Sequence, residues 1–206
     1  MRRLVLAPHM DDESLGCGGL LAKHPEECSV VVVTDSGEQR REEHARALEI
    51  LGVGESVALG LRDGEAQLHM ADLVRRLDDV LRELRPDEVY LPFPSLHQDH
   101  IAVYEAGMRA CRISMSPDHW LPSTVLVYDI AVYDLNLYPS DLTWNTFERL
   151  TEEQVDRKVA ACEAYASENP GGDHPMSSVK QIAGAVGKVR LVPYAEQYAL
   201  VRHIRR

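Results

Sequence analysis

The chain has few cysteines, no long apolar run and fewer basic than acidic residues. Its cysteines lie far apart and form no Cys-x-x-Cys pair, which argues against a thiolate zinc site and a disulfide framework: Cys17, Cys28, Cys111 and Cys162. No segment approaches the roughly 18 apolar residues of a membrane span, and the apolar stretch near the N-terminus is too short for a signal peptide. We therefore expect a cytoplasmic protein that does not span a membrane.

The charge balance narrows the class of partner. The chain has 33 acidic residues but only 22 lysines and arginines, which gives a formal net charge of −11 at pH 7. This surplus of negative charge argues against nucleic acid or an anionic membrane surface as the main partner. A chain of 206 residues, 45% of them hydrophobic, can bury one substantial core but leaves little room for a second. We expect a single domain over residues 1–206.

Short apolar runs alternate with longer helical patterns along the first two thirds of the chain. The runs that indicate strands are residues 4–7, 30–34, 56–59, 89–91 and 124–131. The patterns that indicate helices are residues 13–23, 38–51, 67–84 and 100–112. The run 30–33 consists of valine alone, as a strand covered on both faces requires. The alternation predicts an α/β fold, a Rossmann-like, mostly parallel sheet flanked by helices.

The last third of the chain is richer in turn signals than the part before it. Turn signals occur at residues 116–118 and 139–142, and Thr151-Glu152-Glu153 indicates the start of a further helix. The Gly- and Pro-rich stretch 168–175 is predicted to be a loop.

Two clusters of histidine and acidic residues follow predicted strands. The first is the stretch 7–13, Ala-Pro-His-Met-Asp-Asp-Glu, and the second is 97–100, His-Gln-Asp-His. Ligands of open α/β sheets bind beyond the carboxyl ends of the strands, so both clusters can meet at one sheet edge. Mixed His and Asp side chains suit a borderline cation such as Zn²⁺. The sequence therefore indicates a metal site.

Simpler interpretations exist for parts of these motifs. Acidic residues after a strand are commonly helix caps, so Asp11-Asp12-Glu13 alone would indicate only capping. The run Gly16-Cys17-Gly18-Gly19 lacks the spacing of a dinucleotide fingerprint and is better explained by close helix packing. The histidines outside the clusters have no ligand-spaced partner, and we expect most of them at the surface: His24, His44, His69, His119, His174 and His203.

The two clusters together resemble the signature motifs of the LmbE-like family, also called the PIG-L or GlcNAc de-N-acetylase family. The resemblance covers essentially the whole chain and includes weaker motifs in the family's order: Gly16-Cys17-Gly18-Gly19, Arg40-x-x-Glu43, Gly60-Leu61-Arg62-Asp63-Gly64 and Pro193-Tyr194-Ala195-Glu196. This family contains zinc-dependent deacetylases of N-acetylglucosamine derivatives. One departure is Met10, where many members carry proline.

The resemblance implies a role for each motif residue. It implies that three side chains hold Zn²⁺ as metal ligands: His9, Asp12 and His100. It implies a general base, a group that polarises the oxyanion, and a carboxylate that orients this group or holds its charge: Asp11, His97 and Asp99, respectively. Two residues are implied to bind substrate: Arg40 and Asp63.

The favoured function is hydrolysis of the N-acetyl amide of an N-acetylglucosamine-type sugar or sugar conjugate, a small-molecule substrate. An amidase that acts on a larger N-acyl group, or a non-catalytic sugar-binding protein on the same scaffold, are the alternatives. Retention of Asp11 beside the ligands favours the enzyme, because a degenerate binding protein could lose the base and keep the metal. The resemblance also implies a homo-oligomer.

Overall fold

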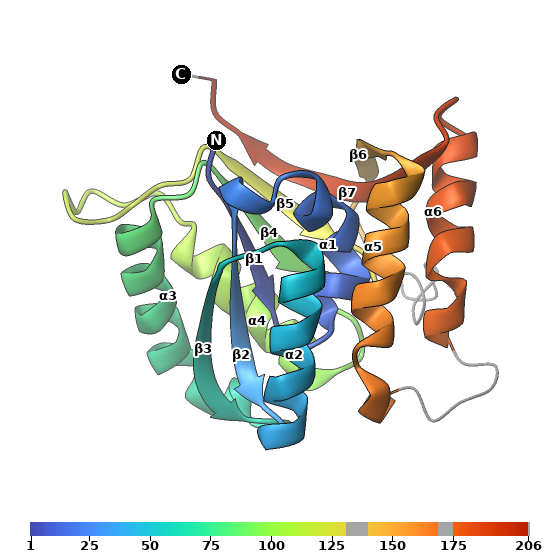
Figure 1. The fold of residues 1–206 in the computed structure, drawn as a ribbon. Coiled ribbons are helices and arrows are strands. Elements are labelled where there is room, and N and C mark those ends of the chain that lie inside the picture. Colours follow the sequence, from blue (N-terminus) through green and yellow to red (C-terminus); the bar gives the residue numbers. More distant parts are fainter. Residues whose placement is uncertain (131–139, 169–174, 206) are drawn as a thin grey trace.

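The predicted strands assemble into one seven-stranded sheet in the computed structural model, which describes residues 1–130, 140–168 and 175–205 (Figure 1). The strands are β1 (Arg3–Ala7), β2 (Cys28–Asp35), β3 (Glu55–Arg62), β4 (Glu88–Pro92), β5 (Thr124–Tyr128), β6 (Trp144–Leu150) and β7 (Tyr194–His203). Their order is β3-β2-β1-β4-β5-β7-β6. The first five strands pair in parallel, whereas β7 runs antiparallel to both β5 and β6. The mostly parallel sheet of the sequence prediction is confirmed.

Helices cover both faces of this sheet. They are α1 (Asp12–Lys23), α2 (Glu38–Leu51), α3 (Met70–Leu84), α4 (Gln98–Ala110), α5 (Glu152–Glu163) and α6 (Val179–Lys188). Short 3₁₀ helices span Pro25–Glu27, Ala66–His69, Ala166–Glu168 and Pro175–Ser178. Figure 1 shows α2 and α5 in front of the sheet and α3 beyond its other side.

The alternating side chains of the central strands divide the core into two layers. Val30 and Val32 of β2 pack with residues of α1, α2 and α5, whereas Val31 and Val33 pack with residues of α3 and α4. A strand that is buried on both faces needs apolar side chains at every position. This requirement explains the unbroken valine run and confirms the predicted Rossmann-like α/β domain.

The glycine run of α1 lets this helix sit close to its neighbours. A Cβ atom at Gly16 would lie 2.1 Å from the Tyr128 ring of β5, and one at Gly18 would lie 2.8 Å from the Lys158 side chain of α5. Both separations are too short for real atoms, so only glycine allows this packing. The run therefore serves close helix packing, as the sequence analysis expected.

Most predicted elements lie where the sequence places them, but the C-terminal part holds elements that were not predicted. Helix 38–51 agrees with α2, and the first turn of the predicted helix 67–84 belongs to a 3₁₀ helix before α3. The strand predicted over 124–131 ends at Tyr128, and Ala131 lies outside the described residues. Most of the loop predicted over 168–175 also lies outside the described residues. Strands β6 and β7 were not predicted because both mix buried and exposed positions and carry little apolar signal.

Membrane insertion and assembly are separate questions. Within the described parts of the chain, no helix is both long enough and apolar enough to cross a bilayer. The cytoplasmic compartment and the homo-oligomer stay predictions.

The four cysteines are buried and carry thiols rather than disulfides. Cys17 and Cys162 lie on one side of the sheet with Cys28, whereas Cys111 belongs to the opposite core layer. Burial raises the pKa of the Cys28, Cys111 and Cys162 thiols to about 12, which suppresses the reactive thiolate. We expect a thiol reagent to react slowly with the native protein and to count four thiols in denaturant without reductant. A count of two or fewer would show that disulfides form between them.

Candidate active site

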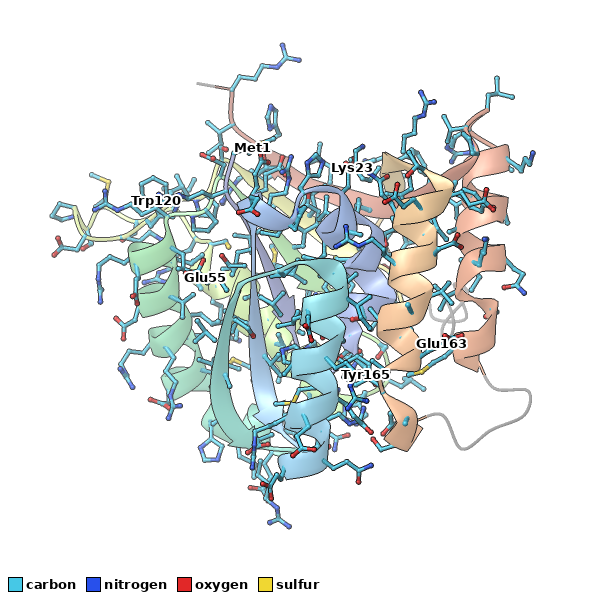
Figure 2. All side chains as sticks on the ribbon, viewed as in Figure 1. Met1, Lys23, Glu55, Trp120, Glu163 and Tyr165 are labelled. Carbon is cyan, nitrogen blue, oxygen red and sulfur yellow. The ribbon has the colours of Figure 1, made fainter. Side chains whose placement is uncertain are left out.

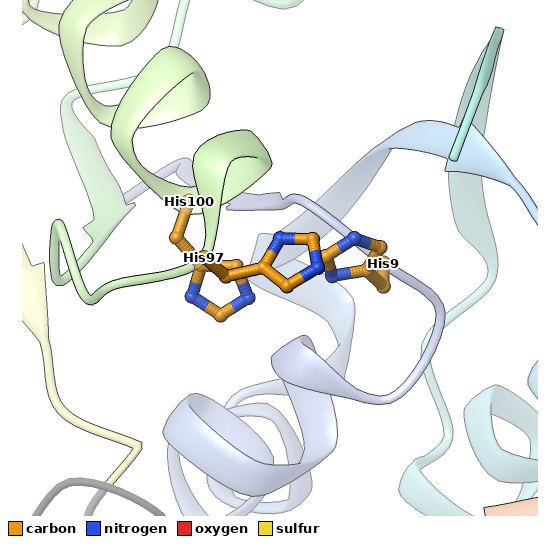
Figure 3. Close-up of side chains that lie close together, drawn as sticks. All are labelled: His9, His97 and His100. Carbon is orange, nitrogen blue, oxygen red and sulfur yellow. The ribbon is translucent and has the colours of Figure 1, made fainter. Parts of the chain in front are cut away.

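The two His- and Asp-rich clusters meet at the carboxyl edge of the sheet, where β1 and β4 are neighbours. The chain leaves β1 toward β2 on one side and later returns to β4 on the other, and ligands bind at such reversals of strand order. His9 follows β1, whereas His97 and His100 lie at the start of α4. The rings converge (Figure 3), with centroids 4.6 Å apart for His9 and His97 and 5.3 Å apart for His9 and His100.

Asp12 lies between two of these imidazoles. Its Oδ2 accepts a hydrogen bond of 2.9 Å from the backbone N–H of His9, and lies 3.2 Å from His9 Nδ1 and 3.3 Å from His100 Nε2. Burial alone would raise the pKa of the Asp12 carboxyl, but His100 and His9 outweigh burial and hold this pKa well below its usual range. Asp12 is therefore ionised, as a metal ligand must be.

The donor set and its spacing fit Zn²⁺. Protein nitrogen and oxygen ligands bind zinc at about 2.0–2.2 Å in a tetrahedron, whose ligand atoms are then about 3.3–3.6 Å apart. The distance from Asp12 Oδ2 to His100 Nε2, 3.3 Å, falls in this range, and that to His9 Nδ1, 3.2 Å, lies just below it. His9, His97 and His100 also offer one ligand atom each within 4.8 Å of one another. His9, Asp12 and His100 could together hold a zinc ion with three protein ligands.

The other side of the His9 ring faces two carboxylates. His9 Nε2 lies 3.2 Å from Asp99 Oδ2 and 3.4 Å from Asp63 Oδ1. Backbone N–H groups of Gly64 and Ala66 donate to the buried Asp99 carboxylate at 2.7 and 3.0 Å, and hold it in place. Burial lowers the pKa of His9, but hydrogen bonds to Asp12 and Asp99 outweigh it and raise this pKa to about 10. A carboxylate behind an imidazole orients the ring and raises its basicity as a ligand.

Asp99 contacts His97 through its backbone and not through its carboxylate. The Asp99 N–H donates to His97 Nδ1 at 3.3 Å, and this bond also caps the start of α4. Burial and the neighbouring His9 and His100 lower the pKa of His97, which favours the neutral ring. With Nδ1 accepting, the neutral ring carries its proton on Nε2 and can donate from there.

Asp11 occupies a strained turn between β1 and α1. Its φ of 147° and ψ of −29° fall in a region that side chains other than glycine rarely adopt. Its carbonyl oxygen accepts hydrogen bonds from Ser14 and Leu15 at 3.0 and 2.9 Å, which fixes the turn to the first turn of the helix. Burial and the charges of Asp12 and Glu13 raise the pKa of Asp11 well above its usual value, although Arg40 opposes the shift.

A buried network around Glu13 supports this turn. Glu13 Oε2 accepts from the Asp11 N–H at 3.1 Å, and Oε1 accepts from Ser14 Oγ at 2.7 Å and from the Tyr165 hydroxyl at 2.6 Å. His44 Nδ1 lies 2.9 Å from the same hydroxyl. Tyr165 follows α5 in the chain, and Figure 2 marks its place beside the lower end of α2.

The sequence analysis missed this network. It expected most histidines outside the clusters at the surface, but His44 is buried, with 7% of its surface exposed. No spacing in the sequence relates His44 or Tyr165 to Glu13, because the contacts join three separate elements. The only sequence signal for this network was Glu13, the acidic residue at the start of α1.

Residues of the two His- and Asp-rich clusters help to line a cavity of about 400 Å³. The predicted site residues that line it are His9, Asp11, Asp12, Arg40, Asp63, His97 and His100. Asp99 lies behind His9 and outside this lining. The wall of the cavity also includes Met10, noted above only as a departure from the family motif, and residues that were not singled out from the sequence: Ser36, Ser95, Leu96, Ile130 and Glu168.

Comparisons with known proteins agree with the motifs. Residues 4–111 match the family model described as GlcNAc-PI de-N-acetylase, PIG-L. The uncharacterized deacetylase YaiS of Escherichia coli K12 is 32% identical over 179 residues, which cover 80% of this chain and 90% of YaiS.

Solved structures share the fold. The conserved protein TT1542 of Thermus thermophilus superposes with a TM-score of 0.82 at 25% identity, over 100% of this chain and 97% of that one. The N,N'-diacetylchitobiose deacetylase of Pyrococcus horikoshii has a TM-score of 0.78 at 22% identity, over 98% of this chain and 84% of that one. The match to the family model and the identity to YaiS carry the assignment: the chain belongs to the GlcNAc-PI de-N-acetylase (PIG-L) family of deacetylases.

Proposed function

We propose that this protein is a zinc-dependent hydrolase that removes the acetyl group from an N-acetylglucosamine-type sugar or sugar conjugate. The observation that carries the proposal is the position of Asp11 beside the His9, Asp12 and His100 set in one cavity. This combination provides a metal site and an adjacent base that is not needed as a ligand. Membership in a deacetylase family supports amide hydrolysis as the reaction.

His9, Asp12 and His100 would hold the metal ion. When bound, Zn²⁺ polarises a carbonyl oxygen and lowers the pKa of a water molecule to about 7, so that this water can act as a nucleophile at neutral pH. Asp99 is the positioning residue for this set, because its carboxylate faces His9 Nε2 and leaves Nδ1 directed at Asp12.

Asp11 would take the proton from the attacking water and later deliver it to the leaving amine. A general base works best when its pKa lies near the operating pH, and burial beside Asp12 and Glu13 moves the pKa of Asp11 upward from its ordinary acidic value. The hydrogen bond from its N–H to Glu13 holds the residue in the strained conformation.

His97 would donate a hydrogen bond to the oxyanion of the tetrahedral intermediate. The backbone N–H of Asp99 occupies Nδ1 of the ring, so Nε2 is the donor even when the imidazole is neutral. Arg40 and Asp63 line the same cavity and are proposed to contact the sugar.

An acetate-release assay tests the proposed function. The zinc-loaded protein is incubated with N-acetylglucosamine, N,N'-diacetylchitobiose and an N-acetylglucosaminide with a larger aglycone, and free acetate and free amine are measured. We expect equal amounts of both products. Parallel substrates with longer N-acyl chains test the amidase alternative. Sugar binding without any product from these compounds would favour the non-catalytic alternative.

The division between ligands and base predicts two classes of variant. Asp11→Asn keeps all three ligands, so we expect it to retain zinc while losing most turnover. His9→Ala, Asp12→Ala and His100→Ala each remove one ligand, and we expect metal content to fall together with the stabilisation that bound metal gives the fold. Elemental analysis and thermal unfolding measure the two properties. Loss of zinc from Asp11→Asn equal to that from Asp12→Ala would show that the assignment of Asp11 as base is wrong.

Removal of His97 should affect the chemical step. A donor to an oxyanion acts mainly in the transition state, so we expect His97→Ala to lower kcat by on the order of 10²–10³ with a small change in KM and zinc retained. His97→Gln, which keeps a donor of similar reach, should recover part of kcat. Unchanged kcat in His97→Ala would remove His97 from the mechanism.

A further inference from the structure

The rim of the cavity is acidic. Among the lining carboxylates, the side chains of Asp11 and Asp12 are 14% and 5% exposed, whereas those of Asp63 and Glu168 are 49% and 44% exposed. Asp63 and Glu168 are thus the carboxylates that an entering molecule meets first.

Arg40 carries the only guanidinium or ammonium group among the described residues that line the cavity. Its Nη1 donates to the carbonyl oxygen of Met10 at 3.1 Å and lies 3.4 Å from Asp11 Oδ2. Its Nη2 pairs with the Glu168 carboxylate, and the guanidinium carbon lies 5.6 Å from the ring centre of Tyr165. The guanidinium charge of Arg40 is therefore already neutralised by protein groups.

We propose that the pairing of Glu168 with Arg40 makes this site select uncharged N-acetylated sugars over those that carry a phosphate or carboxylate. The inference rests on the proposed deacetylase function and specifies its substrate class. Glu168 is then a residue that determines specificity.

Two physical effects support this selection. A phosphate needs unpaired donors such as a free guanidinium fork, and Glu168 occupies the Nη2 nitrogen of Arg40. The carboxylates at the rim and the net charge of −11 repel an approaching anion. An uncharged sugar meets neither obstacle, because its hydroxyl groups can donate to the carboxylates of Asp63 and Glu168.

Glu168→Gln tests the proposal with a matched pair of substrates, N-acetylglucosamine and N-acetylglucosamine 6-phosphate. With the zinc-loaded wild-type protein we expect kcat/KM to be at least about tenfold higher for the uncharged sugar, the effect of about 1.4 kcal/mol. In Glu168→Gln the carboxylate that neutralises Arg40 is lost, so the Arg40 charge can attract the phosphate, and we expect this ratio to fall by about threefold or more. High salt should also reduce the ratio, because rim charges are screened.

Glu163→Gln is the control. Glu163 is an exposed residue at the end of α5 that does not line the cavity (Figure 2), and its substitution changes the net charge by the same amount. We expect its ratio to equal that of the wild type. Equal rates on the two sugars in the wild type, or the same fall of the ratio in Glu163→Gln, would overturn the role of Glu168.

Calorimetric titration of the same two sugars separates this proposal from the proposed function. If neither sugar releases acetate, the deacetylase function fails for these substrates, and the ratio of their dissociation constants still measures charge selection. We expect tighter binding of the uncharged sugar and a smaller ratio in Glu168→Gln. Equal affinities in the wild type, or no gain for the phosphorylated sugar in the variant, would overturn the proposal.

Discussion

The backbone turn at Asp11 is the constraint on which the candidate site depends. It ends β1 and starts α1 within a few residues, so His9 and Asp12 face each other across it at 3.2 Å. A non-glycine residue in such a conformation costs about 1–3 kcal/mol and persists only where its surroundings hold it. Here, Glu13 accepts from the Asp11 N–H, and the carbonyl of Asp11 accepts from the first turn of α1.

The buried position of α1 makes this turn rigid. Its N-terminal acids are satisfied by side chains from other elements, because an unpaired buried charge would be strongly destabilising. At the other end of the helix, Glu196 of β7 accepts from the backbone N–H groups of Gly19 and Leu20 at 2.7 and 2.8 Å and from Lys158 at 2.6 Å. The C-terminal part of the chain therefore supports a site whose motifs lie in the N-terminal half.

The site divides its carboxylates between two environments. Asp12 and Asp99 are buried and pair with imidazoles, which suits a metal site and the residues that orient its ligands. Asp63 and Glu168 are exposed at the rim, where they face the solvent. The same residue type thus occupies two environments in one cavity, one buried against imidazoles and one exposed at the rim.

Much of the fold could be predicted from the sequence, because period and composition are local properties. The valine run of β2 and the alternation of apolar runs with helical patterns indicated a parallel α/β sheet without reference to distant contacts. The two His- and Asp-rich clusters could be recognised in the sequence equally well, since each is contiguous and follows a strand. Their meeting at one edge followed from the general geometry of parallel sheets.

Tertiary structure alone decided which group each side chain faces. Asp99 is two residues from His97 in the chain, yet its carboxylate contacts His9, because the N–H groups of Gly64 and Ala66 hold it there. The pairing of Arg40 with Glu168 likewise joins residues 128 positions apart. Sequence by itself determined the supply of ligands and the layers that carry them. The partners, and with them the charge at each position of the cavity, depend on packing between elements that no local pattern encodes.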